Sequence, residues 1–303
     1  MMTDRAFSLV IALSSVVALG CNDSSAPTPP PGPVTVPAFV FVSDSGGYSN
    51  LVRWRNDSLT TLSSGANNSD PNSVGTRIVY TSNAAGSTHI FIADLALATP
   101  HQVTYGNVYD RSAVLSPAGD SIAFVSLRSG VPRIWLVNAP PLNQATFDTP
   151  TALATGSAAF TPEDGPAWSP AGGLIAFTSV ASGTSQVYVV VSGGGTPQQL
   201  TNESGGAFQP TWSADGAAIY YLAASPSLVL RKIAVSGTGA RTVASDSLNI
   251  GAPASCSSAL CLYAEDPTGV GGFMQALPTS GAAAQRVFAR TAAKERQPAI
   301  LSQ

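Results

Sequence analysis

A short motif, an aliphatic residue followed by any residue and then an aromatic one, recurs along the chain. It occurs as Phe39-Val40-Phe41, Ile78-Val79-Tyr80, Ile122-Ala123-Phe124, Ile175-Ala176-Phe177, Ile219-Tyr220-Tyr221 and, in weaker form, Cys261-Leu262-Tyr263. Subtraction of the residue numbers puts successive aromatic residues 39, 44, 53, 44 and 42 positions apart. A period of about 40–45 residues made of short alternating strands is typical of the four-stranded blades of a β-propeller. The spacing therefore predicts one blade per repeat.

The neighbours of the motif also recur in a fixed order. Before it comes a turn of the type Ser-Pro-x-Gly, seen as Ser116-Pro117-Ala118-Gly119, Ser169-Pro170-Ala171-Gly172 and Ser213-Ala214-Asp215-Gly216. After it come a polar loop, another strand such as Gln186–Val189, and a short last strand such as Gln199–Thr201. No segment from Ala38 onward keeps a helical period, and the 28 Gly and 23 Pro favour short strands and turns. We expect an all-β domain.

The segment Pro166–Ser179, with the sequence PAWSPAGGLIAFTS, resembles the propeller repeat of the TolB type. The resemblance covers about residues 38–303. It implies that the strand ending at Trp168-Ser169 is the innermost of its blade and that later strands run outward. The same repeat type occurs in the propellers of prolyl-oligopeptidase-like enzymes, so the resemblance is specific for fold and uninformative about activity.

Five complete repeats begin near Asn67, Asp110, Glu163, Ala207 and Asn249, and two fragments remain. The C-terminal fragment, 297–302, matches an innermost strand, and the N-terminal fragment from Phe39 supplies three outer strands. Either fragment alone would leave an unpaired strand edge, which their pairing removes. We therefore predict a six-bladed β-propeller of four-stranded blades, in which residues 39–62 and 298–302 share the last blade. The alternative is a broken seven-bladed ring or an open fragment.

Residues 1–21 are typical of an export signal. Arg5 precedes an apolar run from Ala6 to Leu19, which is too short to span a bilayer. The ending Gly20-Cys21 resembles the bacterial lipobox, which implies that Cys21 is the lipid attachment site. The alternative is an ordinary secretory peptide.

Residues 22–37 are rich in Ser, Pro and Thr and predict an extended, disordered linker before a propeller at 38–303. We expect the chain to contact the membrane through the lipid anchor only. Asn22, directly after the anchor, favours the outer membrane of the cell envelope, with the propeller facing the periplasm or the surface.

Composition excludes several functions. Charged residues make up 10% of the chain and the net charge is −3, so nucleic acid is not an expected partner. The two histidines, His89 and His101, are too few for a histidine metal cluster, and we expect both to be half-exposed strand residues. No Gly-x-Ser-x-Gly nucleophile elbow is present. We expect no enzymatic activity and no cofactor, with a channel metal ion such as calcium as the alternative.

Cys256 and Cys261 lie five residues apart around a turn and predict a disulfide that closes a hairpin in an exported protein. The alternative is two buried free thiols.

The residues that lead into each innermost strand should ring one mouth of the central channel, because every blade turns inward at the same point. We hypothesise that this rim binds a cation or a hydrogen-bonding group, such as a metal ion or a basic peptide. The alternative is that its acids cap turns in solvent. The candidates are Asn68, Asp70, Asp110, Arg111, Glu163, Asp164, Phe208, Gln209, Asn249, Arg296 and Gln297.

The sequence thus favours a monomeric, non-catalytic envelope lipoprotein whose propeller binds a protein or peptide partner at its channel face. The TolB resemblance supports a protein partner, because TolB binds a peptidoglycan-associated lipoprotein. The alternatives are a glycan-binding or metal-binding propeller and a propeller hydrolase or lyase.

Overall fold

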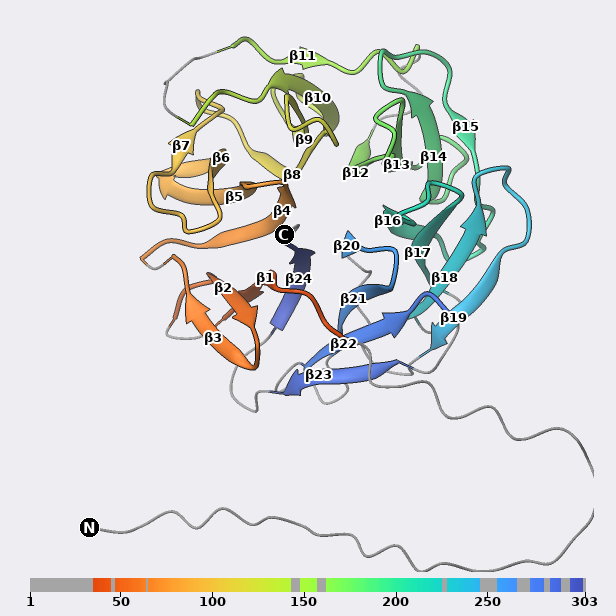
Figure 1. Cartoon of the computed structure of the whole chain (residues 1–303). Helices are drawn as coiled ribbons and strands as arrows, with labels where there is room; N and C mark the ends of the chain where they lie inside the picture. Colours follow the sequence, from red (N-terminus) through yellow and green to blue (C-terminus); the bar gives the residue numbers. More distant parts are fainter. Residues whose placement is uncertain are drawn as a thin grey trace, which may run out of the picture. The chain divides into compact units, whose positions relative to one another are not determined.

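The computed structural model describes residues 35–44, 47–63, 65–142, 148–156, 162–224, 228–245, 255–265, 273–280, 284–289 and 295–301. These residues form six four-stranded antiparallel sheets, arranged as blades around a central axis (Figure 1). Over these ranges every regular element is a strand, and none is a helix able to cross a membrane. The prediction of an all-β, six-bladed propeller is confirmed. Residues 1–34, with Cys21, and Asn249 lie outside the described residues.

Each blade is named here in chain order, and its strands are given from the channel outward. Blade 1 has β4 (Asn68–Val74), β5 (Arg77–Ala85), β6 (Ser87–Asp94) and β7 (His101–Gln102), and blade 2 has β8 (Asp110–Leu115), β9 (Ser121–Ser126), β10 (Arg133–Asn138) and β11 (Thr151–Ala152). Blade 3 has β12 (Glu163–Trp168), β13 (Leu174–Ser179), β14 (Gln186–Val191) and β15 (Gln198–Gln199), and blade 4 has β16 (Ala207–Trp212), β17 (Ala218–Ala224), β18 (Leu228–Ala234) and β19 (Arg241–Ser245). Blade 5 has β20 (Ser255–Cys256), β21 (Leu260–Glu265), β22 (Phe273–Pro278) and β23 (Gln285–Ala289), and blade 6 has β24 (Glu295–Ile300), β1 (Phe39–Ser43), β2 (Asn50–Arg55) and β3 (Ser58–Thr61).

The recurring aliphatic-x-aromatic motif forms the second strand of every blade. Phe124 and Phe177 are fully buried at the centres of β9 and β13. Both faces of these strands are covered, because each blade packs against a neighbour on either side. Two-sided burial explains why the motif lacks the clean apolar–polar alternation of a strand with one wet face.

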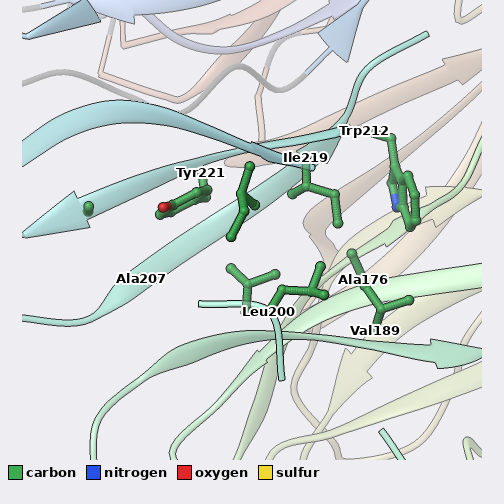
Figure 2. Packing of buried hydrophobic residues seen from close by; sticks show 10 residues of the cluster. Ala176, Val189, Leu200, Ala207, Trp212, Ile219 and Tyr221 are labelled. Carbon is green, nitrogen blue, oxygen red and sulfur yellow. The ribbon is translucent and has the colours of Figure 1, made fainter. Parts of the chain in front are cut away.

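The hydrophobic core is divided into clusters, several of which lie between neighbouring blades. Figure 2 shows the cluster between blades 3 and 4, in which Ala176 and Val189 face Ile219 and Tyr221. Trp212 closes one end of this cluster at 6% exposure, and its indole N–H donates to the carbonyl of Ala167 in blade 3 at 2.9 Å. The core therefore joins neighbouring blades as well as filling them.

Blade 6 is made from both ends of the domain. The innermost strand β24 pairs antiparallel with β1, with Phe39 opposite Ile300 and Val40 opposite Ala299. The N–H of Leu301 also donates to the carbonyl of Ala38 at 2.8 Å. The prediction that the N- and C-terminal strands share one sheet is confirmed, and this sheet closes the ring.

In blade 5 the short innermost strand is linked to its neighbour by a disulfide. Cys256 on β20 is directly opposite Cys261 on β21, with their Cα atoms 4.0 Å apart, and the structure joins the two sulfur atoms. Cys261 is fully buried. The link therefore fastens the channel-lining strand of this blade to the core.

Removing the closing strand should weaken the whole ring. Deletion of residues 298–303 removes buried Ala299 and Leu301 and the strand partners of Phe39 and Val40 in β1. We expect a loss of at least about 3 kcal/mol in the free energy of unfolding, measured by urea denaturation. Deletion of residues 302–303 alone leaves β24 intact and serves as the control. An unchanged unfolding midpoint for the longer deletion would contradict the closure.

The disulfide predicts a measurable loss of stability when it is removed. Replacing both Cys256 and Cys261 with Ser should lower the free energy of unfolding by about 2 kcal/mol, as expected from loop entropy for a loop this short. In the unmodified protein, unfolded without reductant, neither thiol should react with an alkylating agent, as read by mass spectrometry. Alkylation of both residues under these conditions would show free thiols instead.

Candidate functional site

The innermost strands share an irregularity at the same height in the channel. In blades 1, 2, 3, 4 and 6 a β-bulge interrupts the pairing of the innermost strand with its neighbour. At each bulge one residue adopts a left-handed conformation with φ between 51° and 55°. These residues are Asp70, Ser112, Gly165, Gln209 and Gln297.

Proline follows the left-handed residue in four of these five strands, for example Pro210 after Gln209. Proline has no N–H to donate, so it is tolerated where a bulge has already removed a ladder hydrogen bond. A left-handed conformation costs a non-glycine residue about 1–2 kcal/mol, and such residues persist where neighbouring contacts hold them. The bulges therefore form a ring of constrained positions around the channel axis.

A cavity of about 970 Å³ extends from this ring to the channel mouth formed by the Ser-Pro-x-Gly turns, which is called the turn mouth below. Its wall has two chemical halves. Blade 1 contributes mainly polar side chains, whereas blades 3 and 4 contribute three prolines and two tryptophans, Trp168 and Trp212, together with Gln209 and Thr211. The size and the mixed lining suit a ligand with both apolar and hydrogen-bonding groups.

Asp70 is the centre of a hydrogen-bond network that joins three blades. Its carboxylate accepts from the side-chain amide of Gln297 in blade 6 and from the N–H of Ser112 in blade 2, the latter at 3.1 Å. The Asp70 N–H donates to Oε1 of Gln297 at 3.0 Å, and Thr81 donates to the carboxylate at 3.1 Å. These bonds hold the left-handed residues of neighbouring blades at a fixed separation.

Two further contacts connect the same strands nearer the turn mouth. Asn72 Oδ1 accepts from the N–H of Leu115 in blade 2 at 2.9 Å, and Ser73 donates to the carbonyl of Ile300 in blade 6 at 2.6 Å. Side chains of β4 therefore bridge to both of its neighbours, and they fix the width of the cavity on this side.

Three of the rim candidates from the sequence line the cavity, namely Asp70, Gln209 and Gln297. Each is the left-handed residue of its bulge. The structure brings them together around the channel, and their binding role is taken up as a proposal below.

Asp110 does not face the channel, which corrects the expected rim. Its side chain is 0% exposed, and both carboxylate oxygens accept from the guanidinium of Arg128 at 3.0 Å. Arg128 also lies over the rings of Phe124 and Trp135, 5.3 and 5.1 Å from their centres. A buried carboxylate is tolerated when it is paired in this way, so Arg128 accounts for the burial of Asp110 within the blade.

Glu163 is likewise buried, and it joins blade 3 to blade 2. Its side chain is 0% exposed and accepts from the N–H of Ile134 and the hydroxyl of Thr155, both at 2.8 Å, with Arg133 at 3.7 Å. Burial raises the pKa of the Glu163 carboxyl, and the hydrogen bonds and Arg133 oppose the rise. The expected channel-facing role is therefore wrong for this residue also.

The remaining candidates lie outside the cavity lining. Asn68 is buried and donates to the Ser63 hydroxyl at 3.1 Å. Partly exposed Arg111 and Asp164 form an ion pair between blades 2 and 3, and Arg296 pairs with Asp44 beside the closing seam. Phe208 packs against the core of blades 4 and 5.

The two histidines differ in burial. His101 is half-buried, as expected, whereas His89 is only 3% exposed, so the expectation of a half-exposed residue is wrong for His89. Nε2 of His89 lies 2.8 Å from the Ser87 hydroxyl, and its Nδ1 lies 3.8 Å from Asp110 Oδ2. These residues have the identities of a hydrolase triad.

Their geometry does not support that chemistry. The separation of 3.8 Å is too long for the hydrogen bond that orients a catalytic histidine, and Arg128 already occupies both oxygens of Asp110. Ser87 and His89 of blade 1 and Asp110 of blade 2 therefore form a polar contact between the two blades. Among the described residues, no group of three or more His, Cys, Asp or Glu side chains is placed to hold a metal ion.

The sequence reasoning missed Arg77 and Asn72, which line the cavity from blade 1. The sequence does mark the level in the channel at which the cavity begins. The mark is a residue followed by proline, which recurs as Asp70-Pro71, Gly165-Pro166, Gln209-Pro210 and Gln297-Pro298. Proline in a central strand position indicates a bulge.

The raised pKa of Glu163 predicts a pH-dependent contribution to stability. A carboxyl whose folded pKa lies above its unfolded value binds a proton preferentially in the folded state, so its contribution grows as pH falls through the folded pKa and is lost as pH rises. The stability of the unmodified protein relative to Glu163→Gln should therefore increase from pH 7 toward pH 4, measured by urea denaturation. Asp164→Asn, at a partly exposed neighbour, is the control. A stability difference independent of pH would contradict the assignment.

No protein-family model matches the chain. A TolB homologue of Chlorobium chlorochromatii is 31% identical over 154 residues, which are 50% of this chain and 32% of the homologue. The chain thus spans about a third of the length of the curated relatives it matches.

Solved structures share the fold. TolB from Acinetobacter baumannii superposes with a TM-score of 0.71 at 19% identity, covering 87% of this chain and 66% of that one. An oligogalacturonate lyase in complex with manganese superposes with a TM-score of 0.53 at 12% identity, covering 84% and 73%. With the sequence match to TolB homologues and the six four-stranded blades, these comparisons show that the chain forms a TolB-type β-propeller.

Proposed function

We propose that this chain is a non-catalytic lipoprotein of the bacterial cell envelope whose propeller binds a protein or peptide partner in its channel. The observation that carries the proposal is the cavity of about 970 Å³ that opens between the bulge ring and the turn mouth. In this proposal Asp70, Gln209 and Gln297 contact the partner at the inner end of the cavity, and the two tryptophans contact it nearer the turn mouth.

The cavity wall suits a polypeptide segment. Trp168 and the small exposed part of Trp212, which is otherwise buried in the core, offer apolar surface for side chains. The polar residues of blade 1 offer partners for peptide N–H and C=O groups. The walls are rigid, because hydrogen bonds from Asp70, Asn72 and Ser73 tie neighbouring strands together. A preformed cavity binds with little loss of conformational entropy on the protein side.

A protein partner is proposed from the resemblance to TolB, whose homologues match part of this chain. Lipid attachment at Cys21, the linker at 22–37, anchoring at the outer membrane and a monomeric state are proposed from the sequence.

An enzymatic function is the less favoured alternative. The lyase that shares the fold is bound to manganese, yet among the described residues of this chain no cluster of ligating side chains is placed for a metal. Ser87, His89 and Asp110 also lack triad geometry. A glycan ligand remains an outcome of the experiment that follows.

Blocking the turn mouth should abolish binding of the partner. Ala214 is exposed and lines the cavity, so Ala214→Arg places a long side chain in the opening. With the full chain as bait, chemical cross-linking in envelope extracts followed by quantitative mass spectrometry should recover a protein whose yield falls at least about tenfold in this variant.

The control uses the corresponding turn of blade 3. Ala171 is also exposed but does not line the cavity, so Ala171→Arg should leave the yield unchanged. Equal recovery of every protein by Ala214→Arg and the unmodified chain would contradict binding in the channel. Recovery of glycan in place of protein would favour the alternative.

A further inference from the structure

The cavity has an uneven distribution of charge. Among the described residues that line it, only Asp70 and Arg77 carry charged side chains. Asp70 lies in the bulge ring, where its carboxylate keeps its negative charge and accepts from the neutral groups of Gln297, Ser112 and Thr81. Within the cavity, an anionic group of a ligand is therefore favoured only beside Arg77.

Arg77 begins β5 of blade 1 and reaches across to blade 2. Its two terminal nitrogens donate to the backbone carbonyls of Gly119 and Pro140. These bonds use two of the five N–H donors of the guanidinium, and its Nε is buried without an acceptor in the described part of the chain. The two carbonyl groups orient the Arg77 guanidinium, but they carry no net charge and therefore do not neutralise it.

Three arginines of blades 2 and 6, which lie outside the cavity lining, are paired differently. Arg111, Arg128 and Arg296 each contact a carboxylate. No carboxylate of a described residue lies within 4 Å of Arg77. Asp120 attracts it from farther away, and burial lowers the pKa of the Arg77 guanidinium. A partly desolvated cation without a contacting anion is a favourable place for an anionic ligand group.

The opposite wall has a contrasting character. Blades 3 and 4 present Trp168, Trp212 and the prolines Pro166, Pro170 and Pro210 to the same cavity. One ligand could therefore place an apolar side chain against blades 3 and 4 while an acidic group reaches blade 1. A short stretch of peptide can place an apolar side chain and an acidic group on the two walls in this way.

We propose that the channel selects a peptide segment that carries a carboxylate next to an aromatic or large aliphatic residue, with the carboxylate bound by Arg77. This inference rests on the proposed function and names the chemistry of its ligand. The partner is thus an acidic–apolar segment, in contrast to the basic peptide expected from the sequence.

The test uses two dipeptide probes of nearly the same shape, acetyl-Trp-Asp-amide, which carries a carboxylate, and acetyl-Trp-Asn-amide, which carries a neutral amide in its place. Binding to the ¹⁵N-labelled full chain is followed through the indole N–H signals of Trp168 and Trp212. We expect the Asp probe to bind at least about tenfold more tightly, with a ratio that declines as salt concentration rises. Arg77→Gln should bring the ratio close to one.

Two variants serve as controls. Arg55→Gln removes an exposed arginine outside the cavity and should keep the ratio of the unmodified protein. Arg77→Lys retains the charge and should keep most of the preference, which separates charge from folding if Arg77→Gln is unstable.

Equal affinity for both probes in the unmodified protein, or an unchanged ratio in Arg77→Gln, would overturn the inference while leaving the channel as a binding site. Absence of any indole response to either probe would overturn it as well. The proposed function is tested separately by partner capture with the Ala214→Arg variant.

Discussion

The pairing of β24 with β1 is the contact on which the other features of the propeller depend. Six blades form a closed ring only if the last blade is completed by strands from opposite ends of the domain. The closure covers the backbone edge of β1 and brings Gln297 and Ile300 beside blade 1. Without it, Asp70 would lose a partner that holds its left-handed conformation.

The channel follows from this closure and from the bulges. Each bulge sets a left-handed residue at one level of the channel, and the cavity begins there. Bridging side chains hold neighbouring strands in place, as the bonds from Asp70 to Gln297 and Ser112 show. The same constraints that stabilise the ring therefore preorganise the site, which is the arrangement expected of a binding module on a rigid scaffold.

Much of the fold could be predicted from the sequence, because its repeat carries spacing, turn chemistry and a strand pattern that agree with one another. The motif at Phe177 correctly identified a strand, and the turn at Ser169-Pro170 correctly identified the end of the strand before it. The fragment at 297–302 predicted the seam, because an innermost strand with no continuation must pair elsewhere.

The site was less predictable for a physical reason. Sequence position places Asp110 and Glu163 at the start of innermost strands. It does not reveal that Arg128 and Arg133 lie close enough to offset the desolvation cost of burying these carboxylates. Such pairs form between residues that are distant in the chain, within one blade for Asp110 and Arg128 and between blades for Glu163 and Arg133. Arg77 was missed for the same reason, since its partners are backbone carbonyls of the next blade.

Hydrogen–deuterium exchange at the seam tests the closed ring most directly. If β24 completes blade 6, the backbone amides of β1 and β24 that pair with each other should exchange about as slowly as those of β13 in the middle of blade 3. Exchange of the seam amides at the rate of unstructured peptide, while β13 remains protected, would contradict the closed propeller and the channel that depends on it.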